Sequence, residues 1–231
     1  MKNKADTAPW APRPFGPKWA RIVGLVLVKT LWRVQVTGQE NVCAAGPIIV
    51  AGNHTALLDG PLLIGVTPRP AHFLVKGSLF SGPLGVILRG AGQIPVTKEK
   101  GRGALAAAQT VLERGGAVGI FPEGTRGAGD LSQIHPGVGW LAAHTQTPVV
   151  PVAILGTRTA GKSVKSLPRL RSKIVVHFGV PVTPQPTETP GRRDVVAATE
   201  QVRQALIETI TQTSSASGIS LPQDPPKRET N

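Results

Sequence analysis

Short apolar segments that alternate with stretches of helical character constrain the fold of this chain more than any other feature. Apolar runs of strand length occur at 48–51, 117–121, 149–155 and 174–178, with helix-like segments between them. Strands in this arrangement form a mostly parallel sheet that helices bury on both faces. At 231 residues the chain suits one domain. We therefore expect a single-domain α/β fold with a mostly parallel central sheet flanked by helices.

The remaining elements follow from the same periodicities. A glycine pair, Gly115 and Gly116, is expected to end the longest interior helix. The expected helices lie near 59–66, just after Pro83, and near 103–114, 137–144 and 193–211. Further strands are expected near 34–36, 73–75 and 93–96.

The two ends of the chain differ in composition from its interior. Residues 1–17 are rich in proline and are expected to be non-helical. Residues 213–231 combine serine, proline and charge, and are expected to be disordered. The folded domain should therefore span 34–212, with a helix at 18–33 before it.

Residues 18–33 have the pattern of a helix at a membrane surface. Their apolar run is shorter than the roughly 20 residues that cross a bilayer, and basic residues and a tryptophan, Trp19 or Trp32, stand at each end. Such flanks are typical of an amphipathic helix in the headgroup region. A helix packed on the domain core is the alternative. We expect an interfacial helix, and hence a peripheral or monotopic protein at the cytoplasmic face of the cell membrane.

The charge balance favours an anionic partner. Lys and Arg number 26 against 13 Asp and Glu, which gives a net charge of +13. Nucleic acid is not expected, because the basic residues are scattered and only 4% of residues are aromatic. The single cysteine excludes an intramolecular disulfide and a Cys-based zinc site. No metal or other cofactor is expected. Four histidines lack ligand spacing and are expected to be structural: His72, His135, His144 and His177.

A histidine and an aspartate follow the apolar run at 48–51. Open α/β sheets bind ligands where buried strands end, and His54 lies just beyond this strand, with Asp59 five residues later. On one ideal helix their side chains would diverge by about 140°, so they meet only if the chain bends. Asp59, Gly60 and Pro61 resemble a helix start with Asp59 as its N-cap, which leaves His54 in the preceding loop, facing the carboxylate.

This pair suits acid–base chemistry. A carboxylate that holds one imidazole nitrogen leaves the other able to take a proton from an attacking hydroxyl. His54 and Asp59 are therefore candidate catalytic residues. Taken alone, the pair is explained equally well by a helix cap beside a turn histidine.

A glycine-rich polar segment follows a later apolar run and should reach the same sheet edge as His54. Arg126 offers a fork of donors to a phosphate, Thr125 adds a hydroxyl, and Gly124 permits close backbone approach. Glu123 is expected to orient the arginine or a substrate hydroxyl rather than to act as a base. A surface turn with a local Glu–Arg ion pair is the alternative.

Together, Asn-His-x4-Asp at 53–59 and Phe-Pro-Glu-Gly-Thr-Arg at 121–126 resemble the glycerolipid acyltransferases, specifically the bacterial 1-acylglycerol-3-phosphate acyltransferases. The resemblance covers about residues 34–180. It implies that His54 is the general base and that Asp59 orients it. It also implies that the acceptor phosphate is bound by Glu123, Gly124, Thr125 and Arg126.

A third block of the family ends in an arginine that also binds phosphate, and it is matched here by residues 92–98, which end in Lys98. Lysine keeps the charge but lacks the bidentate geometry, so phosphate affinity or acceptor choice can differ. Arg102 is a candidate to compensate. A fourth, apolar block at 149–154 is expected to be structural.

The resemblance implies transfer of a fatty acyl group from an acyl thioester, either acyl-CoA or acyl carrier protein, to the free hydroxyl of 1-acylglycerol 3-phosphate. The product is phosphatidic acid. Expected partners are the lysophospholipid, the acyl thioester or its carrier protein, and the membrane surface through residues 18–33. Another lysophospholipid or a glycolipid is the alternative acceptor.

A competing motif occurs at 156–163, where Gly-Thr-Arg-Thr-Ala-Gly-Lys-Ser matches the phosphate-binding P-loop and follows a predicted strand. A P-loop opens a helix, whereas here Pro168 soon follows. No apolar strand ends in an aspartate that would hold Mg²⁺. A P-loop nucleotidase and a non-catalytic anionic-membrane binder are the alternatives from other classes. A basic lid or membrane contact is a further interpretation of this segment, resting on Arg158, Lys162, Lys165, Arg169, Arg171 and Lys173.

Overall fold

Six α-helices and seven strands follow one another in the residues that the computed structural model describes, which are residue 12 and residues 15–97 and 101–223. The helices are α1 (Gly16–Leu31), α2 (Asp59–Val66), α3 (Gly82–Gly90), α4 (Gly101–Glu113), α5 (Gly137–Thr145) and α6 (Arg192–Ser217). The strands are β1 (Arg33–Thr37), β2 (Ile48–Gly52), β3 (Ala71–Lys76), β4 (Ile94–Val96), β5 (Ala117–Ile120), β6 (Val149–Leu155) and β7 (Lys173–Phe178). Two short 3₁₀ helices are η2 (Gln39–Asn41) and η3 (Gly77–Phe80). Every helix and strand expected from the sequence is present.

The seven strands form one sheet in the order β1-β7-β6-β2-β5-β3-β4. The strands β6, β2, β5, β3 and β4 run parallel, whereas β7 is antiparallel to β6 and β1 is parallel to β7. The prediction of a mostly parallel sheet is confirmed, with one reversed pair of strands at an edge. Because β2 lies between β6 and β5, the loops that leave these three strands are neighbours at the carboxyl edge.

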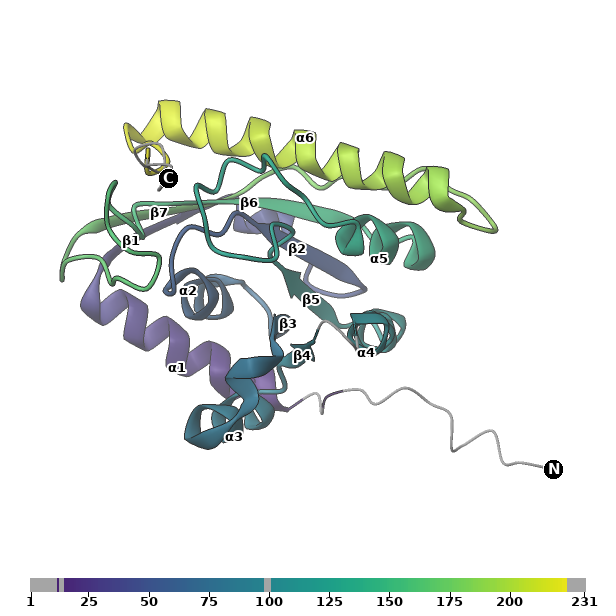
Figure 1. Ribbon diagram of the computed structural model, residues 1–231, viewed down its shortest axis with the longest axis horizontal. Coiled ribbons are helices and arrows are strands. Elements are labelled where there is room, and N and C mark those ends of the chain that lie inside the picture. The colour runs from purple at the N-terminus through teal and green to yellow at the C-terminus, as the bar shows by residue number, and fades with distance from the viewer. Residues whose placement is uncertain (1–11, 13–14, 98–100, 224–231) are drawn as a thin grey trace, which may run out of the picture.

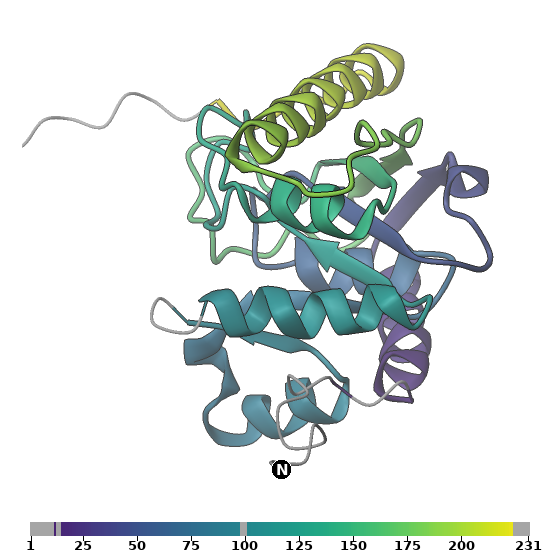
Figure 2. The same cartoon turned by 90° about the vertical axis from the view of Figure 1, so that its right-hand side faces the viewer.

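Helices cover both faces of the sheet (Figure 1). Ile48 and Val50 of β2 pack in the cluster that includes α1 and α2, whereas Ile49 and Ala51 pack in the cluster that includes α4, α5 and α6. Figure 2 shows these layers from the side, with α6 and α1 on opposite sides of the sheet. Burial on both faces explains why the central strands β2, β5 and β6 are apolar throughout, whereas the edge strand β1 alternates.

The first helix packs tightly on α2. Its buried face carries Ala20, Gly24 and Val28, and its opposite face is exposed. Gly24 meets Gly65 of α2 so closely that a Cβ added at Gly65 would lie 2.5 Å from the backbone nitrogen of Leu25. Small residues let the two helix backbones approach, so α1 is part of the domain as well as an exposed surface.

The boundaries at the N-terminal end differ from the prediction. The helix begins at Gly16 rather than at residue 18, and Pro17 lies in its first turn, where a proline costs no intrahelical hydrogen bond. It ends at Leu31, and Arg33 already belongs to β1. Residues 1–11 and 13–14 of the proline-rich segment 1–17 lie outside the described residues.

The prediction of a disordered tail at 213–231 is wrong for its first part. The helix α6 continues to Ser217 instead of ending near 211, and Thr213 is buried. Ile219 and Leu221 then pack against the core beneath α6. The segment is polar in composition, but packing of Thr213, Ile219 and Leu221 against the core is enough to order it. Residues 224–231 lie outside the described part of the chain.

Within the described residues, no helix combines the length and the hydrophobicity that crossing a bilayer requires.

Candidate active site

Three loops converge at the carboxyl edge of the sheet, and they leave β2, β5 and β6. The backbone N–H of Gly127, after β5, donates to the carbonyl oxygen of His54, after β2, at 2.9 Å. On the other side, the hydroxyls of Thr55 and Thr157, after β6, are 3.1 Å apart. The expectation that His54 and Arg126 reach the same sheet edge is therefore confirmed.

The His54 ring and the Asp59 carboxylate meet, as the sequence predicts. Their Nδ1 and Oδ2 atoms are 3.0 Å apart. The chain bends between them, because the Asp59 N–H contacts the carbonyl of Ala56 at 3.4 Å and α2 starts at Asp59. The expected capping role is wrong in detail, since Asp59 is the first helical residue and its carboxylate points back to the loop.

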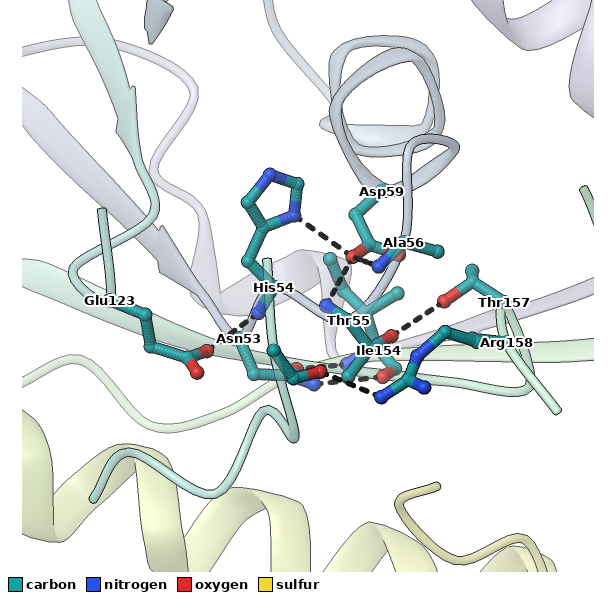
Figure 3. Close-up of polar contacts among 10 residues, drawn as sticks. Asn53, His54, Thr55, Ala56, Asp59, Glu123, Ile154, Thr157 and Arg158 are labelled. Atoms are coloured by element: carbon teal, nitrogen blue, oxygen red, sulfur yellow. Dashed lines mark hydrogen bonds and ion pairs between the residues drawn. The ribbon is translucent and has the colours of Figure 1, made fainter. Parts of the chain in front are cut away.

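Asp59 is fully buried and is held by the backbone of that loop. Its Oδ2 atom accepts N–H groups of Thr55 at 2.7 Å and Ala56 at 2.8 Å, in addition to its contact with His54 (Figure 3). The Oδ1 atom has no hydrogen-bond partner among the described residues. Three contacts on one oxygen fix the carboxylate, so Asp59 in turn fixes the imidazole and leaves its Nε2 for a substrate.

Two neighbours restrict the His54 loop further. The ring of Phe121 stacks on the imidazole with centroids 4.2 Å apart. The Asn53 side chain accepts the Ile154 N–H at 2.7 Å and donates to the Ile154 carbonyl at 3.0 Å. Asn53 thus acts like an extra pair of strand hydrogen bonds to β6, which sequence reasoning did not identify.

Glu123 contacts the His54 loop and not Arg126. Its Oε1 accepts the backbone N–H of His54 at 2.7 Å. Among the described residues, no hydrogen bond or ion pair joins Glu123 to Arg126, so the alternative of a surface turn with a local Glu–Arg ion pair does not hold, and Glu123 does not orient Arg126 by direct contact. Burial raises the pKa of Glu123 to about 7, although hydrogen bonds from the backbone of His54 and Gly129 act in the opposite direction.

The segment from Gly124 to Arg126 follows Glu123, which contacts the His54 backbone, and its residues are exposed or partly exposed. Gly124 has a φ of +67°, and a Cβ there would lie 2.5 Å from the ring of His135, so glycine is required. Thr125 is exposed, and the Nε of Arg126 is buried without a hydrogen-bond partner among the described residues. A partly exposed arginine next to a histidine–carboxylate pair suits an anionic substrate.

The P-loop interpretation of 156–163 is contradicted by the backbone. Turns follow β6 up to β7, and no helix begins after Lys162 in this described stretch. Arg158 is only 6% exposed, and it donates to the carbonyls of Gly127 at 2.9 Å and Lys162 at 3.0 Å. The expectation of Arg158 on a basic surface is therefore also wrong. Arg158 stabilises the loop after β5 by a hydrogen bond to Gly127, a role that the sequence motif did not indicate.

The third block also ends at this edge, because β4 runs parallel to β3. Lys98 lies outside the described residues. Arg102 is exposed in the first turn of α4.

Three of the four remaining histidines contact other parts of the domain and not this site. His72 is buried, its Nδ1 contacts the Gly92 carbonyl at 2.6 Å, and desolvation lowers its pKa. His144 stacks on Trp140 and His177 contacts Thr37. His135 is the exception, because its ring lies against Gly124.

These contacts define a class of protein, an α/β enzyme fold with a His–Asp pair of the kind that can accept a proton, beside a glycine-rich loop that carries an arginine. Residues 33–155, more than half of the chain, match the family model described as Acyltransferase. The chain therefore belongs to the Acyltransferase family.

Several relatives carry the name 1-acyl-sn-glycerol-3-phosphate acyltransferase. The chain is 35% identical to the Borreliella burgdorferi protein over 137 residues, which are 55% of each chain. It is 27% identical to the Bacillus subtilis protein over 179 residues, 76% of this chain and 87% of that one. The human beta form is 32% identical over 126 residues, 52% of this chain and 45% of its own length. Thus the chain spans about half the length of two of these relatives.

A solved structure shares the fold. The 1-acyl-sn-glycerophosphate acyltransferase of Thermotoga maritima superposes with a TM-score of 0.67 at 22% identity, over 94% of this chain and 84% of that one.

Proposed function

We propose that the chain transfers a fatty acyl group from an acyl thioester to the free hydroxyl of 1-acylglycerol 3-phosphate, forming phosphatidic acid. The hydrogen bond between His54 and Asp59 beside the loop at 121–127 is the observation that carries the proposal. Family membership and the names of the relatives support the same reaction.

In this proposal His54 is the general base. Asp59 accepts the Nδ1–H, so the Nε2 lone pair takes the proton of the acceptor hydroxyl. The hydroxyl oxygen attacks the thioester carbonyl carbon to give a tetrahedral adduct. Collapse of the adduct breaks the carbon–sulfur bond, and His54 returns the proton to the departing thiolate. Acyl-CoA and acyl carrier protein both supply such a thioester.

The acceptor phosphate is proposed to bind at Gly124, Thr125 and Arg126, with Lys98 as a further cation. The exposed position of Thr125 and the partly exposed position of Arg126 support this site. Glu123 contributes differently from what the family resemblance implies. Its Oε1 is occupied by the His54 N–H, so it is proposed to position the base and the phosphate loop together.

Attachment to the surface of an anionic membrane is proposed through α1, as a peripheral or monotopic protein on the cytoplasmic leaflet. The side chains that support it are exposed, apolar and on the outer face of the helix: Trp19, Ile22, Val23, Val26 and Leu27. The basic residues around them, together with the net charge of +13, favour the negatively charged cytoplasmic leaflet.

The test measures release of free thiol from a long-chain acyl thioester with lysophosphatidate as acceptor. We expect His54→Ala to lower kcat by about 10²–10⁴, the usual contribution of a general base. His177→Ala, on β7, is the matched control and should retain wild-type turnover. Full activity of His54→Ala would refute the assigned base, and an unreactive wild type would leave the membrane binder as the better interpretation. Lysophosphatidylcholine in place of lysophosphatidate tests the acceptor.

A further inference from the structure

The connection between β6 and β7 carries a second apolar and basic surface, apart from α1. Leu167 and Leu170 are 61% and 69% exposed, although each could have been buried in a domain of this size. Within residues 162–173, the other exposed residues are Ser163 and five cationic residues: Lys162, Lys165, Arg169, Arg171 and Lys173. We call residues 162–173 the basic loop.

No aspartate or glutamate occurs between Asp130 and Glu188, so the chain offers the basic loop no acidic neighbour in sequence. Arg171 adopts a φ of +64°, an uncommon conformation for a side chain of this size. The turn there is held by the Ser172 N–H, which donates to the Arg169 carbonyl at 3.1 Å. A defined turn therefore presents Leu170 to solvent.

The basic loop is fastened to the end of α1. The Arg171 N–H donates to the Leu31 carbonyl at 2.8 Å, and the Trp32 indole N–H donates to the Pro168 carbonyl at 3.2 Å. In Figure 1 the connection from β6 to β7 lies beside the C-terminal end of α1. The basic loop is thus held against the C-terminal end of the helix whose outer face is exposed and apolar.

The loop also borders the candidate active site. The N–H of Leu57, between His54 and Asp59, donates to the Val164 carbonyl at 3.0 Å, and the Leu57 side chain is itself exposed. An apolar and basic loop that contacts both the end of α1 and the segment between His54 and Asp59 matches an anionic lipid bilayer in its chemistry.

We propose that the basic loop is a second membrane contact, in which Leu167 and Leu170 enter the headgroup boundary while Lys165 and Arg169 bind lipid phosphates. This role rests on the proposed function: the contact would hold the opening of the His54 site at the bilayer, where a lysophospholipid resides. With α1 alone the protein could pivot about the helix axis, whereas two contacts fix its orientation.

The experiment uses the full chain and vesicles of phosphatidylcholine mixed with phosphatidylglycerol. Because Cys43 is the single cysteine, C43S/L170C carries one environment-sensitive dye at the loop, and C43S/V196C places it on the exposed face of α6 as a matched control. We expect a blue shift and an intensity increase on vesicle addition for the label at 170 and none for the label at 196. Equal responses at both positions would overturn the proposal.

Binding constants give a second readout. We expect L167S/L170S to weaken vesicle binding about tenfold, and K165Q/R169Q to weaken it about fivefold per charge removed. Thermal unfolding should stay at the wild-type value, because all four side chains are exposed. Unchanged vesicle binding in both variants contradicts the proposal. The proposal is also contradicted if the variants bind vesicles normally but lose activity only with an acyl carrier protein donor. That result would assign the loop to binding of the acidic carrier protein.

Turnover of a water-soluble, short-chain thioester and acceptor separates the two proposals. If wild type and L167S/L170S turn over this pair equally while only the variant loses vesicle binding, both proposals are supported. If wild type lacks turnover, the proposed function fails, while the dye response still decides the fate of the membrane contact.

Discussion

Two carboxyl groups hold the backbone around His54 in different ways. Asp59 binds the N–H groups of the two residues that follow the histidine, Thr55 and Ala56, whereas Glu123 binds the N–H of the histidine itself. Consecutive backbone donors are thereby satisfied inside the domain, where an unpaired N–H would be costly. The imidazole is fixed by its backbone as much as by its ring contact.

The raised pKa of Glu123 predicts a pH dependence of stability. The folded state retains the proton up to about pH 7, whereas the unfolded chain releases it near 4.5. The stabilising contribution of the protonated group is therefore fully present below 4.5 and is lost as the pH rises through 7. We expect the stability of Glu123→Gln relative to wild type to increase by about 2 kcal/mol from pH 5 to pH 8.

Urea unfolding at the two pH values measures this difference. The amide oxygen of the variant can still accept the His54 N–H, so the fold is retained. Glu188→Gln, at an exposed position, is the control and should show no such trend. A flat difference for Glu123→Gln would mean that the carboxyl group is ionised in the fold at neutral pH.

In a P-loop Lys162 would be the essential residue, but here we expect substitution of Arg158 to have the larger effect on stability and turnover. We expect Arg158→Met to lower the free energy of unfolding by about 1–3 kcal/mol, because the carbonyls of Gly127 and Lys162 lose a charged donor. Its turnover of soluble substrates should fall at least tenfold, since Gly127 also contacts His54. Lys162→Ala, at an exposed position, should leave both quantities unchanged.

Denaturant titration and thiol release measure the two effects. Arg158→Lys restores the charge without the planar fork and should recover only part of the loss. ATP hydrolysis that requires Lys162 would reverse this interpretation.

At the scale of elements, the pattern of apolar residues predicted each helix and strand. The central strands are buried on both faces and are uninterrupted apolar runs, whereas the edge strand β1 alternates. The end of α6 was not predictable in this way. Its last turns are polar in sequence, and they persist because Thr213, Ile219 and Leu221 pack on the core. Tertiary contacts of this kind override local composition.

The candidate site was predictable where chemistry depends on local spacing and not where it depends on packing. The bend between His54 and Asp59 follows from a local helix start. The pairing of Glu123 with the His54 backbone and the burial of Arg158 arise between loops that are neighbours only because β2 lies between β5 and β6. No periodicity or motif in one sequence records that order of strands.

The crossing of α1 and α2 predicts opposite results for two glycines of the same helix. Gly65→Ala should destabilise the fold by about 1–3 kcal/mol, because the added methyl group would lie 2.5 Å from the Leu25 nitrogen. Gly60→Ala meets nothing within 4 Å and should change stability by at most about 1 kcal/mol, in the stabilising direction. Thermal unfolding of both variants measures the contrast. Equal melting temperatures would show that the helices can separate without cost.

At the scale of the whole molecule, α1 serves the core with one face and leaves the other exposed. Deletion of residues 1–33 would therefore remove Val28 and Trp32 from the core, so loss of membrane binding would not be separable from unfolding. Point substitutions on the outer face are the appropriate test.

We expect Ile22→Ser combined with Val26→Ser to weaken binding to anionic vesicles about tenfold, since both side chains are exposed and apolar. The melting temperature should not change. Vesicle sedimentation measures the binding. Raising the salt from about 0.1 to about 1 M shortens the Debye length from about 10 to about 3 Å, so it should weaken the wild type further. Vesicle binding that is unaffected by both the double substitution and the higher salt concentration would argue against α1 as the membrane contact.

The segment beyond α6 has a practical consequence. Leu221 lies against Gly129, which also borders Thr55 and Asn53. The last described residues therefore pack against the loop that contacts the two neighbours of His54. The polar composition after residue 212 suggests that the protein could be shortened there. Such a truncation would remove this packing contact. Affinity tags and truncation points therefore belong after residue 223.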